Sequence, residues 1–258
     1  YGAAFLTFAV LLFLIGYILI SGIPHLKPSL FALQYTSENV SMLPAMITTV
    51  EMTVLALLLA VPFGLFTAVY LNEYAARGSR LVRVIRITTE TLSGIPSIVF
   101  GLFGMLFFVT RLHWGYSLLA GAMTLAIMIL PLIMRTAEEA LMAVPDSFRE
   151  ASFGLGAGRL RTVFRIVLPS AMPGILSGVI LGIGRIVGET AALIFTAGTM
   201  AQIPGLLQSG RTLAIHMYVL SGEGLHMNEA YATAVVLLAV VLLMNTLSAL
   251  VAKKLTKK

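Results

Sequence analysis

Long apolar runs separated by polar connections are the dominant pattern along this chain. A helix that crosses the hydrocarbon core of a membrane needs roughly 20 predominantly apolar residues. Runs of this kind occupy 3–21, 46–70, 87–109, 117–134 and 230–251, and a further one follows Pro169. The pattern predicts an all-α, polytopic membrane protein with six transmembrane helices, organised as a single domain over residues 1–258.

Composition supports this prediction. Hydrophobic residues make up 59% of the chain and charged residues 11%, a balance that excludes an ordinary soluble domain. The chain has no cysteine, and its four histidines are not at metal-ligand spacing, so we predict neither disulfides nor a metal site. Because the chain begins without an initiator methionine, we expect the natural protein to extend further at its amino terminus.

The net charge of +6 is sorted along the sequence. Thirteen of the 17 Lys and Arg residues fall within 77–86, 135–165 and 253–258, which alternation of the spans places on one side of the membrane. The positive-inside rule makes that side the cytoplasm. We therefore predict cytoplasmic termini, a basic cytoplasmic link at 72–86, and an external segment at 198–228 with a short helix near 212–220. Net charge here indicates topology and gives no sign of a nucleic-acid partner.

Two spans contain helix-breaking or small residues. In the third run, Pro96 removes a backbone hydrogen bond, and a broken helix is tolerated at membrane depth only against protein or a water-filled cavity. Pro62 and Gly64 similarly interrupt the second run. The break at Pro96 favours a position that lines a pathway or faces another subunit.

The polar stretch 144–169 lies between the fourth and fifth runs. Ser147 and Glu150 fit a capping box at the start of a short helix, which Gly154 and Gly156 would end. A second amphipathic piece covers 159–167, and Pro169 is predicted to close it. The result is a helical elbow outside the bilayer with a mixed apolar and basic surface. From the residues alone, an ordinary interfacial loop is an equally good interpretation.

The fifth run has a small and polar face when it is wound as a helix through residue 189. Gly174, Gly178 and Gly182 form a stripe that permits close approach of another helix. Arg185 and Glu189 share that half of the wheel. An arginine within a span costs roughly 2.5–3.5 kcal/mol by insertion scales, and an i,i+4 partner offsets only part of this. A cavity, a second subunit or an anionic ligand would supply the rest.

The elbow resembles the EAA signature of the permease subunits of ATP-binding-cassette importers. The matching positions are Glu150, Ala151, Gly156, Ile166, Leu168 and Pro169, with Ser152 in place of the second alanine. The resemblance implies the type I importer permease fold, with a core at about 46–251. It also implies that 144–169 is the cytoplasmic coupling helix that docks on an ATP-hydrolysing subunit.

Other motifs resemble the phosphate importers of this family more narrowly. They are the GIPSIVFGLFG run at 94–104, the stretch 136–141 that leads into VPDSFREAS, and GRIVGETAAL at 184–193. The second and third of these are similar to the PstA type. In the third, Ala192 stands where the family more commonly has Pro. The resemblance places Arg185, Glu189 and Thr190 in the phosphate pathway. Arg185 would supply a fixed donor fork for phosphate oxygens.

The same resemblance implies a set of partners in the bacterial cytoplasmic (inner) membrane. They are a related permease of the PstC type, two copies of a cytoplasmic ATPase and an extracytoplasmic phosphate-binding protein. ATP and Mg²⁺ would be used by the ATPase, since the chain contains no phosphate-binding Walker loop. We expect the chain itself to bind no cofactor and to have no catalytic residues.

Two alternatives from the sequence stay open. The first is an importer permease for another oxyanion or a small polar nutrient, because the elbow motif does not specify cargo. The second is an ATP-independent secondary transporter or channel, which would show paired broken helices in two repeats. A membrane-embedded enzyme is less well supported, since no nucleophile–base or metal-ligand set is apparent.

Overall fold

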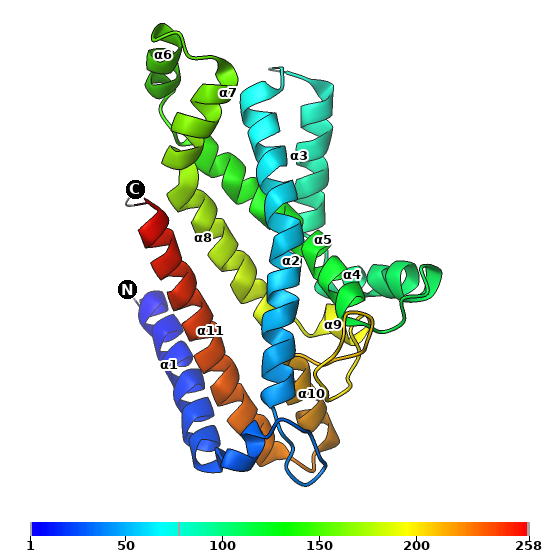
Figure 1. Cartoon of the computed structure of the whole chain (residues 1–258). Helices are drawn as coiled ribbons and strands as arrows, with labels where there is room; N and C mark the ends of the chain where they lie inside the picture. The colour runs from blue at the N-terminus through cyan, green and yellow to red at the C-terminus, as the bar shows by residue number, and fades with distance from the viewer. Residues whose placement is uncertain (1, 77, 257–258) are drawn as a thin grey trace. The chain divides into compact units, whose positions relative to one another are not determined.

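The computed structural model describes residues 2–76 and 78–256, and every regular element in that part of the chain is helical. The predicted basic zones 77–86 and 253–258 extend beyond it at Arg77, Lys257 and Lys258. Figure 1 shows the elements along the chain. Their bounds are α1 Gly2–Gly22, η1 Ile23–His25, η2 Pro28–Phe31, α2 Leu43–Val69, η3 Tyr70–Tyr74, α3 Arg80–Ser93, α4 Ser97–Gly104, η4 Met105–Arg111, α5 Leu118–Met142, α6 Asp146–Gly154, α7 Arg159–Thr162, η5 Val163–Val167, α8 Leu168–Val187, α9 Ala191–Ile194, α10 Leu213–Glu223 and α11 Met227–Thr256.

The predicted spans correspond to helices of sufficient length and apolarity. Within the described residues, five continuous helical segments meet these requirements, and they begin at Gly2, Leu43, Leu118, Arg159 and Met227. A sixth candidate is the pair α3 and α4 with η4, which is bent by 103° at the break before Ser97. The prediction of a break at Pro96 is confirmed, although the bend is too sharp for a straight span over 87–109.

Three boundary predictions were wrong. Residues 80–86 belong to α3 and do not form a link, because Arg80, Arg83 and Arg86 alternate with apolar residues at helical spacing. Pro62 lies inside the continuous helix α2 and does not interrupt it. Pro169 likewise lies at the start of α8, where the helix continues from the preceding turns.

The helix continues past Pro169 because the turn before it is widened. Residues Val163–Val167 form a π-helical turn in which the Leu168 N–H donates to the Val163 carbonyl, five residues back. A proline has no N–H to give, so a local change of hydrogen-bond spacing is a common way to accommodate it within a helix. The same kind of turn, Tyr70–Tyr74, ends α2.

The chain forms two compact units. The first contains Tyr1–Met52, Gly101–Gly121 and Val187–Leu242, and the second contains Thr53–Phe100, Ala122–Ile186 and Leu243–Lys258. In the first unit, the end of α1 packs closely on α11, where a side chain at Gly22 would collide with the Tyr231 backbone. The Leu213 N–H donates to Thr49 Oγ1 over 2.9 Å, which joins α10 to α2.

The core of the second unit lies where α2, α5 and α8 meet the elbow. The glycine stripe of α8 packs on α5, as predicted: a Cβ at Gly174 would lie 2.6 Å from Ala140 Cβ, and one at Gly182 would lie 3.3 Å from Ile133 Cδ1. Buried apolar side chains from these elements fill the space beneath the elbow. They are Ala68, Val69, Leu71, Met134, Ala137, Leu141, Val144, Val163, Val167, Ala171 and Ile175.

Candidate functional site

The elbow at 144–169 consists of α6 and α7 joined by a tight glycine turn. α6 ends at Gly154, and Gly156 has φ +81°, a left-handed conformation that glycine adopts without steric cost. The predicted turn is therefore confirmed. The predicted capping box is wrong, because Pro145 is the N-cap of α6, Ser147 lies two residues after it, and no side chain caps the helix.

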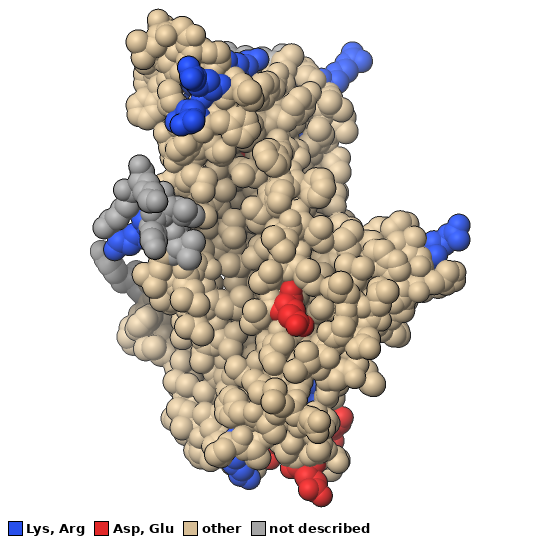
Figure 2. All heavy atoms as spheres, in the orientation of Figure 1, with Lys and Arg blue, Asp and Glu red and all other residues tan. Residues whose placement is uncertain are grey.

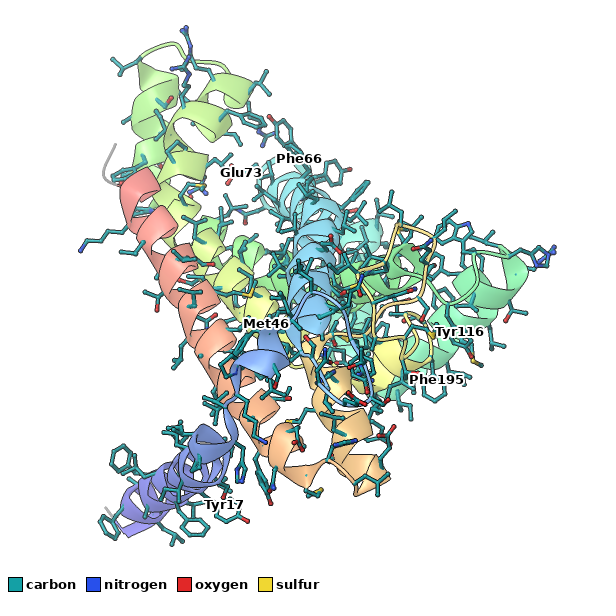
Figure 3. The ribbon with its side chains drawn as sticks, turned by 60° about the horizontal axis from the view of Figure 1, so that its bottom comes forward. Tyr17, Met46, Phe66, Glu73, Tyr116 and Phe195 are labelled. Atoms are coloured by element: carbon teal, nitrogen blue, oxygen red, sulfur yellow. The ribbon has the colours of Figure 1, made fainter. Side chains whose placement is uncertain are left out.

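A buried ion pair holds the elbow against the end of α2. The Arg149 Nη2 donates to Glu73 Oε1 over 2.7 Å and its Nε donates to Glu73 Oε2 over 3.3 Å. The two side chains are only 15% and 8% exposed. Asn72 Nδ2 also donates to Glu73 Oε1, over 2.8 Å. Figure 3 labels Glu73, which lies beside the elbow helices. Since a two-point guanidinium–carboxylate contact fixes orientation, α6 is tied to α2 as well as to its chain neighbours.

Arg149 also organises the backbone at the start of the elbow. Its Nη1 donates to the Val144 carbonyl over 2.8 Å, and its Nη2 donates to the Leu141 carbonyl over 3.0 Å. The hydrogen bond to Glu73 raises the pKa of the Arg149 guanidinium above its ordinary value. One local signal for this pair is present in the sequence, because Glu73 is the single acidic residue of the predicted basic link at 72–86.

The two elbow helices are locked together by a pair of hydroxyl groups. Ser152 Oγ and Thr162 Oγ1 lie 2.8 Å apart in a buried hydrogen bond, and Thr162 Oγ1 donates to the Gly158 carbonyl over 3.2 Å. The serine that departs from the EAA pattern thus has a structural role in this chain. The elbow is a preformed unit.

The outer surface of the elbow is apolar with basic side chains around it. Exposed apolar side chains belong to Phe148, Phe153, Leu155, Leu160 and Phe164, and Leu155 is 90% exposed. Figure 2 shows Lys and Arg atoms over α6 and α7 on the face drawn. Of the predicted coupling residues, Glu150, Ala151, Gly156 and Pro169 are exposed, while Ile166 and Leu168 are half-buried. Such a surface suits a protein partner better than water.

The three predicted pathway residues do not share one helix. Arg185 is exposed in the last turn of α8, and no described carboxylate of the second unit pairs with it. The helix ends at Val187, so the predicted placement of Glu189 on the same helical face was wrong. Glu189 belongs to the first unit, where it is buried and accepts the Ala192 N–H over 3.0 Å. Thr190, half-buried, is the N-cap of α9.

α8 ends directly before Gly188, a residue type with low helix propensity. Glu189 then accepts a free backbone donor at the start of α9, which is the usual role of an acidic side chain at a helix N-terminus. Glu189 therefore does not continue the helix that carries Arg185.

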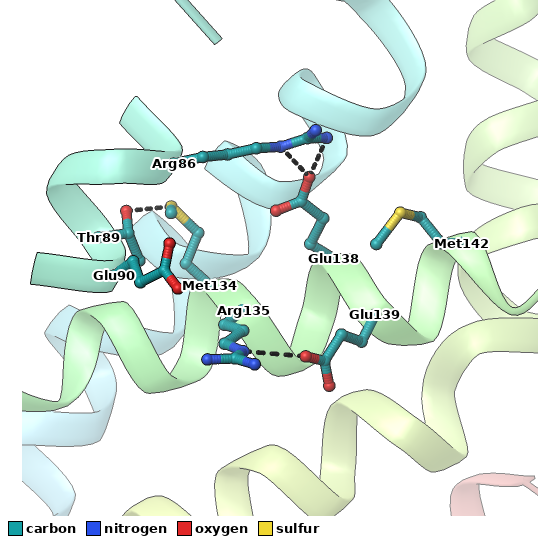
Figure 4. A pocket seen from close by; sticks show the side chains of 8 residues that line it. All are labelled: Arg86, Thr89, Glu90, Met134, Arg135, Glu138, Glu139 and Met142. Atoms are coloured by element: carbon teal, nitrogen blue, oxygen red, sulfur yellow. Dashed lines mark hydrogen bonds and ion pairs between the residues drawn. The ribbon is translucent and has the colours of Figure 1, made fainter. Parts of the chain in front are cut away.

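A second charged cluster, which the sequence did not reveal, lies between α3 and α5. A pocket of about 270 Å³ is lined by Arg86, Thr89, Glu90, Met134, Arg135, Glu138, Glu139 and Met142. Figure 4 shows that Arg86 reaches Glu138, while Arg135 bonds Glu139 one turn along α5. Arg86 Nε donates to Glu138 Oε1 over 2.9 Å. Since Glu138 is buried, this pair positions α3 on α5.

None of these clusters has the composition of a metal centre. Within the described part of the chain, no group of three or more His, Cys, Asp or Glu residues could hold a metal ion. What the geometry offers is an exposed apolar surface on the elbow and an exposed arginine at the end of a packed helix.

A protein-family model described as "Binding-protein-dependent transport system inner membrane component" matches residues 60–258. The chain belongs to this family. The match includes the elbow, the glycine stripe and the Arg185–Thr190 stretch, and it confirms the family that the sequence motifs suggested.

Curated relatives of this family member carry more specific names. A probable ABC transporter permease protein, YqgI of Bacillus subtilis (strain 168), is 33% identical over 238 residues, which cover 84% of this chain and 79% of that protein. The phosphate transport system permease protein PstA 1 of Mycobacterium tuberculosis (strain ATCC 25618 / H37Rv) is 47% identical over 143 residues, or 55% and 46% of the two chains. PstA of Pasteurella multocida (strain Pm70) is 41% identical over 197 residues, or 71% and 69%. The match thus spans about half the length of the mycobacterial relative.

Solved structures confirm the fold. A chain of the inward-facing MetNI methionine ABC transporter aligns with a TM-score of 0.65 at 19% identity, covering 83% of this chain and 94% of that one. A chain of a bacterial alginate ABC transporter, in complex with an alginate pentasaccharide-bound periplasmic protein, aligns with a TM-score of 0.67 at 15% identity, covering 100% and 97%. The predicted type I ABC importer permease fold is therefore confirmed.

Proposed function

We propose that this chain is a permease subunit of an ATP-driven importer that carries inorganic phosphate across the bacterial inner membrane. The observation that carries the proposal is the 47% identity over 143 residues to a protein named as a phosphate transport permease. The Pasteurella relative of the same name extends that support over 71% of the chain.

In this proposal the elbow is the docking element for a cytoplasmic ATPase. Its exposed Phe148, Phe153 and Leu155 would enter a groove of that subunit, while Gly156 allows the left-handed turn and the exposed Glu150 would face the partner. The Arg149–Glu73 pair would pass movement of the docked elbow to α2. ATP and Mg²⁺ are bound by the ATPase, and this chain remains a non-catalytic subunit without a cofactor.

Arg185 is the proposed contact for the cargo. Its guanidinium is exposed and permanently charged, and its planar donor fork matches two oxygens of a phosphate group. Thr190 and Glu189 stand at the start of α9, where Glu189 would fix the local backbone rather than orient Arg185.

The remaining partners follow from the same proposal. A related permease of the PstC type completes the pathway, two ATPase copies supply energy, and an extracytoplasmic phosphate-binding protein delivers the cargo. The elbow and both termini face the cytoplasm, as the distribution of Lys and Arg favours.

The cargo is tested by competition. The chain is produced with its neighbouring subunits, and uptake of radiolabelled phosphate into energised vesicles is measured with a large excess of unlabelled phosphate, sulfate or a small neutral nutrient. We expect only unlabelled phosphate to abolish uptake. If sulfate or another oxyanion competes equally while phosphate uptake is slow, the subunit is an importer permease for a different anion.

A further inference from the structure

A buried arginine without an acidic partner lies in the first unit. Arg211 is only 4% exposed, and its Nε and Nη2 have no hydrogen-bond partner. No carboxylate of that unit, among the residues described, forms an ion pair with it. A guanidinium stays protonated even when it is buried, so its charge needs compensation from an anion.

Further polar atoms without partners surround the same position. Thr212 Oγ1 and both ring nitrogens of the buried His216 lack a hydrogen bond of good geometry, although the His216 ring lies close enough to the Val40 backbone to affect its pKa. Thr212 and His216 are four residues apart, which puts them on one face of α10. The aromatic ring of Tyr35 links the group: its centroid lies 4.6 Å from Arg211 Cζ and 6.3 Å from the His216 ring centroid.

The start of α10 adds a positive helix end to this cluster. Thr212 is the N-cap residue, yet no side chain caps the helix. The first backbone bond of the helix runs from the His216 N–H to the Thr212 carbonyl over 2.8 Å. The Leu213 N–H already donates to Thr49 Oγ1, so this end offers an anion the positive end of the helix dipole. The guanidinium, the hydroxyl group and the helix end thus favour the same kind of ligand.

The loop that carries Tyr35 is held rigidly in a strained conformation. Thr36 and Asn39 exchange two backbone-to-side-chain bonds, of 2.9 and 3.1 Å. Val40, a β-branched residue, is left with φ +44°, which such residues rarely adopt. Strain of this kind persists where surrounding contacts over-determine the backbone, commonly at ligand sites.

We propose that Arg211, Thr212, His216 and Tyr35 form a binding site for a small oxyanion of the phosphate class. Arg211 donates its unused fork, Thr212 donates one hydrogen bond, His216 lines the site, and Tyr35 holds the guanidinium by cation–π contact. The site contains neither Arg185 nor any elbow residue. It rests on the proposed function only for its side of the membrane, since the 198–228 segment is proposed to be external.

Glu51 does not remove the need for an anion. Its Oε2 is buried without a hydrogen-bond partner, and among the described residues Glu51 forms no ion pair with Arg211. A ligand bound at Arg211 would therefore supply the negative charge that Glu51 does not.

The test measures binding without transport. The full chain, with the subunits that co-purify with it, is placed in nanodiscs of phosphatidylcholine without ATP, and radiolabelled inorganic phosphate is titrated by equilibrium dialysis. We expect Arg211→Gln to weaken the Arg211-dependent binding by about tenfold or more, and Thr212→Val by about threefold to tenfold. Arg111→Gln, which alters an exposed arginine of the same unit, is the matched control and should bind as wild type does.

A second arm identifies the source of the oxyanion. If free phosphate does not bind, phosphatidic acid is added to the nanodiscs and the thermal midpoint is followed. If phosphatidic acid raises the thermal midpoint of wild type and of Arg111→Gln but not that of Arg211→Gln, the site binds a lipid phosphate group. Wild-type binding in Arg211→Gln, or no response of wild type to either probe, overturns the proposal.

If Arg211→Gln fails to assemble, the same binding measurements on Thr212→Val test the site instead. An unchanged response in Thr212→Val would then overturn the site, and a weakened one supports it. Because binding is read without ATP, loss of this site and failure of phosphate transport are separate results.

Discussion

At the scale of single residues, the proposed cargo contact depends on the geometry of Arg185. If its fork meets phosphate, Arg185→Lys should lower phosphate uptake by about tenfold or more although the charge is kept, because an ammonium group cannot form two parallel hydrogen bonds to one anion. Uptake is compared at matched membrane abundance, with Arg111→Lys as the control.

Glu189→Gln provides a companion to this measurement. The amide oxygen can still accept the Ala192 N–H, so the start of α9 should be preserved and assembly should be normal. Full uptake by Arg185→Lys would show that Arg185 acts only as a positive charge. The paired replacement Arg185→Gln with Glu189→Gln should not restore uptake, since the two side chains are not an i,i+4 pair on one helix.

His216 predicts a specific sensitivity to acid. Burial, together with the nearby charge of Arg211, lowers the pKa of His216 from 6.5 to about 3. Below pH 6.5 the unfolded chain takes up a proton that the folded chain refuses, so stability falls as pH decreases from 6.5 towards 3. The contribution approaches about 1.4 kcal/mol per pH unit for one proton.

Thermal midpoints between pH 7 and 5 test this in the anion-free protein. His216→Gln should lose less stability over that interval than wild type does, while His113→Gln, which alters an exposed histidine, should behave as wild type. Equal losses in wild type and His216→Gln would contradict the assignment. A bound anion should reduce the effect, because negative charge raises the pKa of a neighbouring histidine.

At the scale of elements, the apolar pattern was enough to predict the helices but not their ends or partners. The runs near α1, α2, α5 and α11 were found from hydrophobicity, since length and apolarity decide a membrane helix. The helix ends predicted at Pro62 and Pro169 were wrong because the helix continues through both residues. A π-helical turn or close packing can accommodate the missing N–H of a proline, and both depend on tertiary context. The first half of α3, residues 80–86, was assigned to a link because its arginines indicate a charged segment before they indicate a helix.

In the candidate site, the local turn could be predicted from the sequence but the long-range contacts could not. The elbow residues follow a fixed spacing, so the turn at Gly156 could be located from the sequence. The Arg149–Glu73 pair joins positions 76 residues apart, and the Arg86–Glu138 pair joins positions 52 apart. No local pattern specifies such contacts. Glu189 was placed on the wrong face because the predicted helix ran past its true end at Val187. Beyond a helix end, the helical spacing no longer determines where a side chain points.

The elbow turn can be tested with two glycines of the same loop. Gly156 has φ +81°, Gly158 has φ −74°, and a Cβ at either meets open space. Gly156→Val should strain the turn by about 1–2 kcal/mol, whereas Gly158→Val should not. We expect Gly156→Val to reduce phosphate uptake several-fold while ATP hydrolysis continues, and Gly158→Val to remain coupled. Equal coupling in both variants would show that the left-handed turn does not shape the docking surface.

At the scale of the whole molecule, the positive-inside distribution predicts which segments face the cytoplasm. The chain has no cysteine, so Ala76→Cys in the link before α3 and Gly205→Cys in the segment before α10 can be labelled without background. Both positions are exposed. In intact cells, an impermeant thiol reagent should label Gly205→Cys and leave Ala76→Cys unmodified until the membrane is opened. Labelling of Ala76→Cys from outside would reverse the topology.

The central claim is that this fold imports phosphate only when an ATPase docked on the elbow hydrolyses ATP. The most direct test is phosphate accumulation in proteoliposomes that contain the assembled subunits, with the binding protein on one side and ATP on the elbow side. The account predicts uptake against a phosphate gradient that requires hydrolysable ATP and stops with a non-hydrolysable analogue. Uptake that follows an imposed ion or phosphate gradient equally well without ATP would contradict it and identify a secondary transporter or channel.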